Sequence, residues 1–181
     1  SNSHFLSKDV ATEFRGRGIE IHVYPLSFAE LYAAEGGDTS ALWKRYCVYG
    51  GLPYLATLEN NAKRAEYLTS LNKTLYLRDI VERNRIVNVE EFSELMCVMA
   101  SGISSPCNPN KIANTFKTVK KETLAPQTIS KYLSYMEDAF IIEHSTRYDV
   151  KGRRYIGTLS KYYFQDIGLR NALLNFRQTE E

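Results

Sequence analysis

One helix constrains the fold of this chain more than any other part of its sequence. After Pro126, apolar residues recur at positions i, i+3, i+4, i+7 and i+11. These residues are Ile129, Tyr132, Leu133, Met136 and Phe140. The spacing puts all of them on one face of an amphipathic helix, which must bury that face against other elements. We therefore predict a packed helical core in the second half of the chain.

The segments around this helix predict a second helix and a β-hairpin. Asn108-Pro109 places a capping residue before a proline at the first helical position, which predicts a short helix at 111–116. A polar connection, 118–123, then leads to the helix after Pro126. Strands are predicted at 140–148, 155–157 and 161–164. Two helices, a polar turn and a hairpin, in this order, indicate a winged helix-turn-helix.

Helix signals also fill the first half of the chain. Ser27 and Glu30 have the spacing of a capping box, in which each side chain bonds the other residue's amide. Thr39 and Ser40 are expected to cap the next helix. The predicted helices are 27–36, 41–48, 63–85 and 88–102, and the last of them carries an apolar stripe formed by Phe92, Leu95, Met96 and Met99. The alternating residues 19–23 predict a strand. The expected fold class is therefore mainly α with small β.

The composition argues against a membrane-spanning protein, a disulfide-rich protein and a metal-binding protein. No run of 18 apolar residues occurs, so we expect no membrane-spanning helix. Cys47, Cys97 and Cys107 form no close pair, which argues against a disulfide framework or a zinc site and favours a reducing, cytoplasmic setting. The three histidines are scattered, and no metal site is predicted.

Positive charge is concentrated in one segment. Residues 105–165 hold ten Lys or Arg and five Asp or Glu, a net charge of +5, although the whole chain carries only +2. A basic segment favours a polyanionic partner, and a solvated lysine-rich face is the alternative. If duplex DNA is the partner, the helix after Pro126 enters the major groove and the hairpin tip holds phosphates. The candidate DNA-binding residues are Gln127, Thr128, Lys131, Arg147, Lys151, Arg153 and Arg154.

Several short blocks, spread in order over nearly the whole chain, resemble a prokaryotic family of AAA+-superfamily ATPases with a C-terminal region of unknown function. The blocks are Ser1-Asn2-Ser3-His4-Phe5-Leu6-Ser7, Gly16-Arg17, Ile19-Glu20-Ile21, Tyr24-Pro25-Leu26-Ser27-Phe28-Ala29-Glu30, Tyr49-Gly50-Gly51-Leu52-Pro53-Tyr54, Arg78-Asp79-Ile80-Val81 and Lys161-Tyr162-Tyr163-Phe164-Gln165-Asp166-Ile167-Gly168-Leu169-Arg170. The resemblance implies that this chain is the middle part of a longer protein, whose winged helix is followed by a nuclease-like domain.

The same resemblance implies that this chain is divided into four regions. Residues 1–26 are a remnant of the α/β P-loop ATPase core, 27–86 a helical lid, 87–165 a winged-helix domain and 166–181 the start of the nuclease-like domain. Neither a phosphate-binding Gly-x-x-x-x-Gly-Lys-Ser/Thr loop nor a magnesium-binding strand occurs here. We therefore expect no enzymatic activity from the fragment and no cofactor of its own. ATP and magnesium are implied for the parent protein, where Asn2, Ser3 and Arg17 resemble nucleotide-sensing residues.

Two functions stay open at this point. The first is a DNA-binding or regulatory module of an ATP-driven switch. The second is a protein-interaction or autoinhibitory module, whose basic face docks on an acidic protein partner or on its own ATPase core without binding nucleic acid. An exposed strand at 19–23 is also expected to pair with another copy of the chain, which would give a homo-oligomer.

Overall fold

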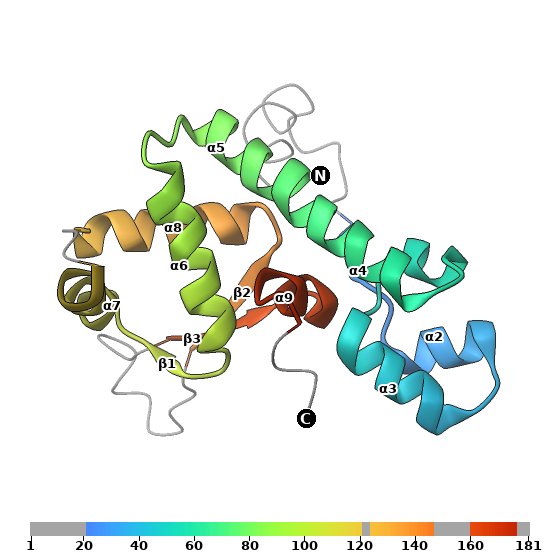
Figure 1. Ribbon diagram of the computed structural model, residues 1–181. Helices are drawn as coiled ribbons and strands as arrows, with labels where there is room; N and C mark the ends of the chain where they lie inside the picture. The colour runs from blue at the N-terminus through green and yellow to red at the C-terminus, as the bar shows by residue number, and fades with distance from the viewer. Residues whose placement is uncertain (1–20, 121–123, 147–159, 177–181) are drawn as a thin grey trace, which may run out of the picture.

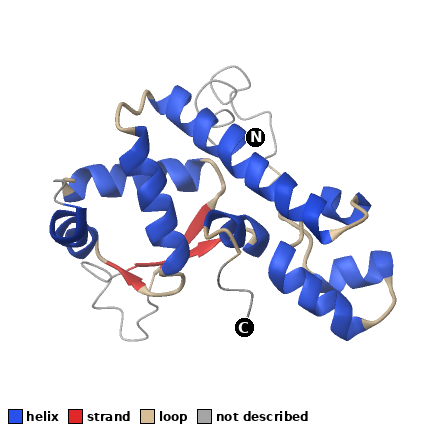
Figure 2. Cartoon of the chain, in the orientation of Figure 1, coloured by secondary structure: helices blue, strands red, loops and turns tan. Residues whose placement is uncertain are grey.

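A computed structural model describes residues 21–120, 124–146 and 160–176 (Figure 1). This part of the chain is mainly helical with one small sheet, as the sequence predicts (Figure 2). The α-helices are α2 (Phe28–Glu35), α3 (Thr39–Tyr49), α4 (Asn61–Ser70), α5 (Arg78–Asn84), α6 (Val89–Ser101), α7 (Pro109–Thr115), α8 (Pro126–Asp138) and α9 (Ile167–Leu173). The strands are β1 (Pro106–Cys107), β2 (Ile142–Ser145) and β3 (Ser160–Phe164). A 3₁₀ segment, η2 (Pro53–Thr57), and two π-helical segments, η3 (Leu71–Leu77) and η4 (Phe116–Lys120), complete the helical part.

The capping signals of the first half locate its helices well. The capping box before α2 is formed, with the Ser27 amide donating to Glu30 Oε2 over 2.8 Å and the Glu30 amide donating to Ser27 Oγ over 3.3 Å. The prediction that Thr39 or Ser40 caps α3 is wrong, because Asp38 Oδ1 accepts the Ser40 amide over 3.0 Å instead. A negatively charged carboxylate in this position also interacts favourably with the positive end of the helix dipole, whereas a neutral hydroxyl gains less from it.

The long helix predicted at 63–85 is present but not uniform. It begins at Asn61, where Asn60 Oδ1 accepts the Lys63 amide over 2.9 Å, and it ends at Arg85 in a left-handed conformation with φ of 51°. Its middle, η3, is π-helical and separates α4 from α5. The apolar periodicity of 63–85 did not predict this π-helical segment. A π-helical turn holds one more residue than an α-helical turn but requires no particular residue types.

The larger of two hydrophobic cores, called the large core below, lies between α5, α6, α8 and the sheet. It contains the predicted stripe of α6 and four of the five predicted apolar residues of α8, all of them buried. The fully buried side chains are Ile80, Phe92, Leu95, Met96, Ile129, Leu133, Met136, Ile141 and Ile142. Each such side chain contributes roughly 1.5–3 kcal/mol by leaving water, so this core supplies much of the stability of the fold.

The sheet is antiparallel and has the order β1-β3-β2. Ile142 pairs with Phe164 and Ser145 with Lys161, while Cys107 of β1 pairs with Ser160. The predicted strand 161–164 is confirmed, whereas the predicted strand 140–148 is shorter, because Phe140 has a positive φ of 55° and β2 begins only at Ile142. Sequence patterns missed β1 because two residues are too short to show alternation. The predicted strand 155–157 lies outside the described residues.

The predicted strand 19–23 is not formed in its described part. Residues 21–27 belong to neither a helix nor a strand, and Ile21 and Val23 are 79% and 82% exposed. The alternation needs a neighbouring strand and a face to bury, and the structure describes no strand beside this segment. The segment is held at its end, where the Leu26 amide donates to the Gly51 carbonyl over 2.8 Å.

A second, smaller hydrophobic core, called the small core below, is built around α4 and α9. Its buried members are Leu55, Leu68, Leu169 and Ala172. The segment 166–173 therefore packs directly on the helices of the first half. The proposed division of the chain into four parts stays a prediction.

The N-terminus of α8 generates a stability prediction. Ala125 has the extended backbone of a cap residue, with φ of −68° and ψ of 141°, but it makes no side-chain cap. We expect Ala125→Ser to stabilise the fold by about 1 kcal/mol, because its hydroxyl can accept a first-turn amide. Urea unfolding measures the gain. Ala125→Val, which adds atoms but no acceptor, is the matched control, and an equal midpoint for both variants would contradict the capping argument.

Candidate functional site

The exposed face of α8 carries the polar residues that the sequence singled out. Gln127, Ser130 and Lys131 are exposed and Thr128 is half-buried, while the opposite face lies in the large core. The Lys131 ammonium lies 5.8 Å from the centre of the Tyr135 ring, a cation–π contact along the same face. The structure therefore brings together Gln127, Thr128 and Lys131, three of the seven predicted DNA-binding residues, on one surface.

The neighbouring helix α7 packs against α8 and, with η4, adds further exposed lysines. Lys111 and Lys117, on α7 and η4, are both exposed. Asn108 caps α7, and its Oδ1 accepts the amides of Asn110 and Lys111 over 2.9 and 3.4 Å. Residues 109–118 and 126–134 contain no Asp or Glu. The polar surface of α7 and α8, called the α7–α8 face below, therefore carries cationic side chains and no carboxylate within these two ranges.

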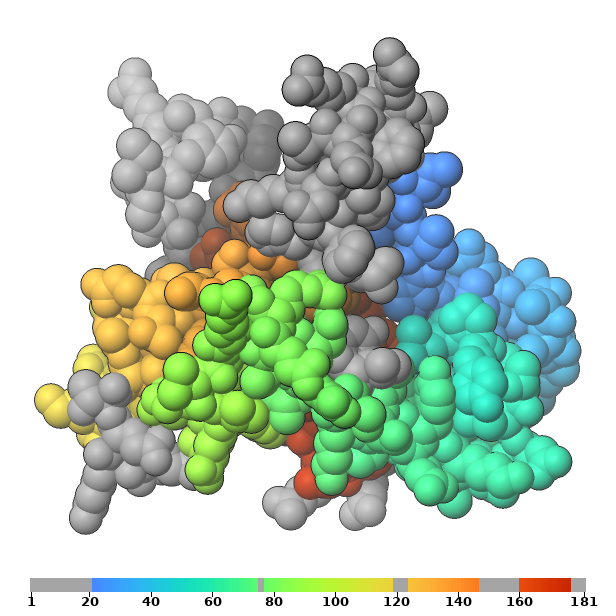
Figure 3. All heavy atoms as spheres, turned by 90° about the horizontal axis from the view of Figure 1, so that it is seen from above, coloured from blue at the N-terminus to red at the C-terminus, as the bar shows by residue number. Residues whose placement is uncertain are grey.

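The position of α7 and α8 leaves this face at one end of the molecule. In the space-filling view the two helices, yellow and orange, lie together on the opposite side from α2 and α3, in blue and cyan (Figure 3). Lys111 and Lys117 are the residues that sequence reasoning missed. They were counted in the basic segment, but their place beside α8 depends on how α7 packs. A sequence count carries no such information.

The remaining predicted residues cannot be placed. Arg147, Lys151, Arg153 and Arg154 lie outside the described residues. The same holds for Asn2, Ser3 and Arg17.

A cluster of polar contacts on the sheet sits near the end of α8. His144 Nδ1 contacts Glu137 Oε1, and Gln165 Nε2 donates to Glu143 Oε2 over 3.0 Å. Burial, followed by the charge of Glu137, raises the pKa of the neighbouring Tyr162 to about 12. The Tyr162 hydroxyl therefore stays protonated at neutral pH, and the contact of His144 with Glu137 joins β2 to the end of α8.

The Asp166 carboxylate is buried and held by backbone hydrogen bonds. It accepts the Gly51 amide over 2.7 Å and the Leu169 amide over 3.0 Å, which caps α9. Burial raises the pKa of Asp166, and hydrogen bonds from the backbone of Gly51, Leu169 and Gly168 oppose that rise. Both oxygens are occupied by backbone donors, so this carboxylate is not free to hold a metal.

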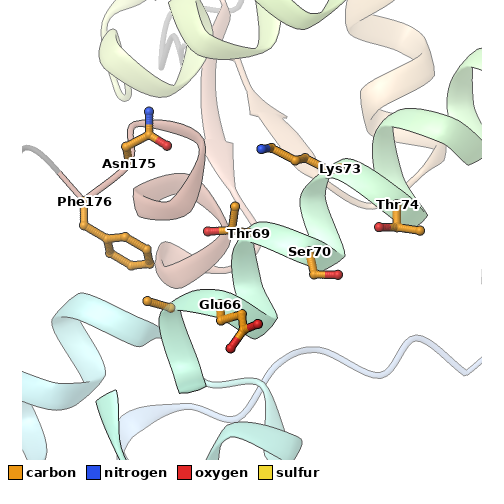
Figure 4. Close-up of a pocket in the computed structure, with 8 residues that line it drawn as sticks. Glu66, Thr69, Ser70, Lys73, Thr74, Asn175 and Phe176 are labelled. Atoms are coloured by element: carbon orange, nitrogen blue, oxygen red, sulfur yellow. The ribbon is translucent and has the colours of Figure 1, made fainter. Parts of the chain in front are cut away.

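A shallow groove of about 560 Å³ lies where α4 and η3 meet the turn after α9. Figure 4 shows Lys73 extending toward the turn that carries Asn175 and Phe176. The other lining residues are Ala65, Glu66, Thr69, Ser70 and Thr74. The lining holds a carboxylate and an amine but no histidine or cysteine, so it offers no paired nucleophile and base.

The comparisons with known proteins identify a family. The model of a domain of unknown function, DUF8612, matches residues 40–180, most of the chain. This chain belongs to the DUF8612 family. The match shows no relation to AAA+ ATPases, so the resemblance seen in the sequence blocks stays a hypothesis.

Two relatives of this DUF8612 chain are uncharacterized proteins. One, from Haemophilus influenzae, is 33% identical over 175 residues, which cover 94% of this chain and 43% of the relative. The other, from Methanocaldococcus jannaschii, is 26% identical over 192 residues, covering 99% of this chain and 43% of the relative. The chain thus spans less than half of the length of each relative. No solved structure matches it significantly.

Three observations limit the chemistry of the described part of this DUF8612 chain. It holds no group of three or more His, Cys, Asp or Glu side chains able to bind a metal ion. None of its helices has the length and apolar character needed to cross a membrane. All three cysteines are free thiols, and burial raises the pKa of each, with the charge of Glu94 adding to the rise at Cys97.

These thiols generate a reactivity prediction. A raised pKa lowers the thiolate fraction at pH 7.5, so we expect all three to react with a disulfide reagent more slowly than free cysteine. Cys47 is exposed and should react first, whereas Cys107, only 8% exposed, should react last. The fast phase should vanish in Cys47→Ser. Three equally fast thiols would contradict both the pKa direction and the burial.

Proposed function

We propose that this chain is the duplex-DNA-binding, non-catalytic part of a larger protein, and that the α7–α8 face is the contact surface. The observation that carries the proposal is the combination of exposed Lys111, Lys117 and Lys131 with an absence of acidic residues from 109–118 and 126–134. A surface that approaches phosphates must supply cations and avoid carboxylates, because the phosphate backbone supplies most of the non-specific affinity.

The arrangement of elements supports a winged-helix interpretation. The chain order is α6, β1, α7, α8, β2 and β3, and the sheet order is β1-β3-β2. In winged-helix proteins of this order, the helix in the position of α8 is the one that enters the major groove. Gln127 and Lys131 have side chains that can pair with adenine and guanine edges.

The N-terminus of α8 adds a second attraction for phosphate. Pro126 has no amide hydrogen, and the side chain of the cap residue Ala125 makes no hydrogen bond to the helix. The first-turn amides of Gln127 and Thr128 would then donate to a bound phosphate, which the helix dipole also favours. A backbone phosphate bound here would fix the helix in the groove while Lys131, one turn on, reaches the bases.

We further propose that the longer protein is an AAA+-type ATPase, with ATP and magnesium bound outside this chain. The support is the ordered set of sequence blocks, together with relatives more than twice as long as the matched region. In that protein, Asn2, Ser3 and Arg17 would sense the nucleotide. The region 27–86 would act as a lid, and we expect a cytoplasmic location.

An exposed aromatic surface favours a second candidate function, protein docking. Phe28 packs edge-on against Trp43 at 4.8 Å and against Tyr46 at 5.7 Å between ring centres. Trp43 is 50% exposed and Tyr32 40% exposed. Exposed aromatic groups on one surface are typical of protein interfaces, so α2 and α3 would form a docking surface independent of the α7–α8 face.

The DNA proposal is tested by fluorescence anisotropy of a labelled random-sequence duplex, titrated with the whole chain between 50 and 200 mM salt. We expect affinity to fall steeply with salt, since each phosphate contact adds about 0.9 to the slope of log affinity against log salt. Lys111→Ala and Lys117→Ala should each lower the slope by about 1. Lys131→Ala should weaken binding further if that side chain reaches a base.

The control variant is Lys44→Ala, an exposed lysine on α3, at the other end of the molecule. It should leave both the affinity and the salt slope unchanged. Equal losses in Lys44→Ala and Lys117→Ala would mean that only net charge matters. An absence of binding at 50 mM salt would remove the DNA proposal and leave the aromatic docking surface as the better candidate.

A further inference from the structure

The two hydrophobic cores are linked along the chain by one long helical segment. It begins in the small core with Leu68 on α4, passes through η3, and reaches the large core with Ile80 on α5. Its midpoint is π-helical, and such segments interrupt the regular hydrogen bonding of an α-helix. This connection alone would leave the two cores joined by an irregular stretch of helix.

Helix α9 bridges the same two cores from the other side. Leu169 and Ala172 belong to the small core, whereas Leu173 packs against the large core. Figure 1 shows α9 between the α3–α4 helices and the sheet. A helix of only seven residues thus contacts both parts of the molecule.

Asn171 fastens α9 to the C-terminal turn of α3. Its Nδ2 donates to the carbonyl of Cys47 over 3.0 Å and to that of Val48 over 2.9 Å. These carbonyls belong to the last turn of α3, where backbone acceptors lack partners within the helix. The approach is close, since a Cβ on Gly168 would come within 1.9 Å of the Tyr49 carbonyl oxygen.

The preceding residue, Arg170, fastens α9 to α6. Its Nε donates over 2.8 Å to the carbonyl of Ala100, in the last turn of α6. The Cys97 thiol, also on α6, lies 3.7 Å from the Leu173 carbonyl and donates to it. Two adjacent side chains of α9 therefore bond the C-terminal turns of two different helices, one beside each core.

Two buried polar groups complete the attachment to the small-core side. Asp166 accepts the Gly51 amide, and a Cβ on Gly50 would lie only 2.3 Å from Asp166 Oδ1. Asn72, in η3, donates from Nδ2 to the Leu169 carbonyl over 2.9 Å. The π-helical segment is thus itself bonded to α9, at the place where the long helix is irregular.

We propose that α9 is a clamp that makes the two cores unfold and move as one cooperative unit. Any rearrangement of α3 and the Gly50-Gly51 turn is transmitted through Asn171 and Arg170 to α6 and the large core, which carries α8. The proposal concerns internal coupling and does not depend on DNA binding or on the identity of the longer protein. It assigns the segment after β3 a coupling role that its sequence resemblance does not imply.

The experiment compares two probes of urea unfolding in Asn171→Asp. Trp43, the single tryptophan of the chain, lies on α3 and reports the small-core side by fluorescence, whereas far-UV circular dichroism reports all helices. In the unchanged chain the two transitions should coincide. In Asn171→Asp, Arg170 Nη1 can still donate to one carboxylate oxygen, but the other oxygen replaces Nδ2 and faces the Cys47 and Val48 carbonyls with no hydrogen to donate. The fluorescence midpoint should therefore fall below the dichroism midpoint by about 1 M urea.

Matched controls separate coupling from a general loss of stability. Asn84→Asp makes the same chemical change in α5, where Asn84 Nδ2 donates to the Ile80 carbonyl over 3.0 Å, away from α9. Leu133→Ala removes a buried side chain of the large core. Both should lower the two midpoints together. Two separate transitions in the unchanged chain, or coincident transitions in Asn171→Asp, would overturn the proposal.

A milder variant covers the case in which Asn171→Asp does not fold. Arg170→Lys keeps the charge but removes the Nε–H that bonds Ala100, and it should separate the two midpoints in the same sense by a smaller amount.

Gly168→Ala, which pushes α9 away from α3, should also separate the two midpoints. Gly102→Ala, where the new Cβ would meet its nearest neighbour at 3.4 Å, should not. Coincident transitions in both Arg170→Lys and Gly168→Ala would refute the clamp.

Discussion

The burial of one face of α8 is the constraint on which the rest of the structure depends. Ile129, Leu133 and Met136 leave almost no surface to solvent, and α6 and the sheet enclose them. Once this face is buried, the opposite face has to be the exposed one. Packing therefore decides which side of α8 can meet a partner, and Gln127 and Lys131 are on that side because of their spacing from the apolar stripe.

The second constraint concerns backbone carbonyls that helices leave unpaired at their C-terminal ends. Both α3 and α6 end next to α9, and side chains of α9 bond carbonyls in their last turns. Burying these helix ends without such donors would cost about 1–3 kcal/mol per group. The polar residues Asp166, Arg170 and Asn171 are consequently structural. Their hydrogen bonds explain why a segment that resembles the start of another domain contains charged and amide side chains in its packed face.

Features set by interactions between residues close in the sequence were mostly predicted correctly, whereas features set by distant residues were mostly missed. Caps made within four residues, such as Ser27 with Glu30 and Asn108 with the amides after it, were predicted correctly because both partners are visible together. The apolar stripes of α6 and α8 were equally clear from their period. One local prediction was wrong, since Asp38 caps α3 in place of Thr39 or Ser40. The other errors have a different origin. The strand at 19–23 needed a neighbouring strand, and β1 has meaning only through its pairing with β3. The candidate interface was found in part, because Lys111 and Lys117 join α8 only through the packing of α7.

The sequence by itself determined the mainly helical class, most of the helix boundaries, the buried faces of α6 and α8, and the concentration of positive charge. These follow from local capping and periodicity, which act within a few residues. Only the tertiary structure decided that Gly51 meets Asp166, that α9 bonds α3 and α6, and that η3 interrupts the long helix beside Leu169. These contacts join residues 70 or more positions apart, and no local pattern encodes which distant carbonyl or amide a buried polar side chain will meet.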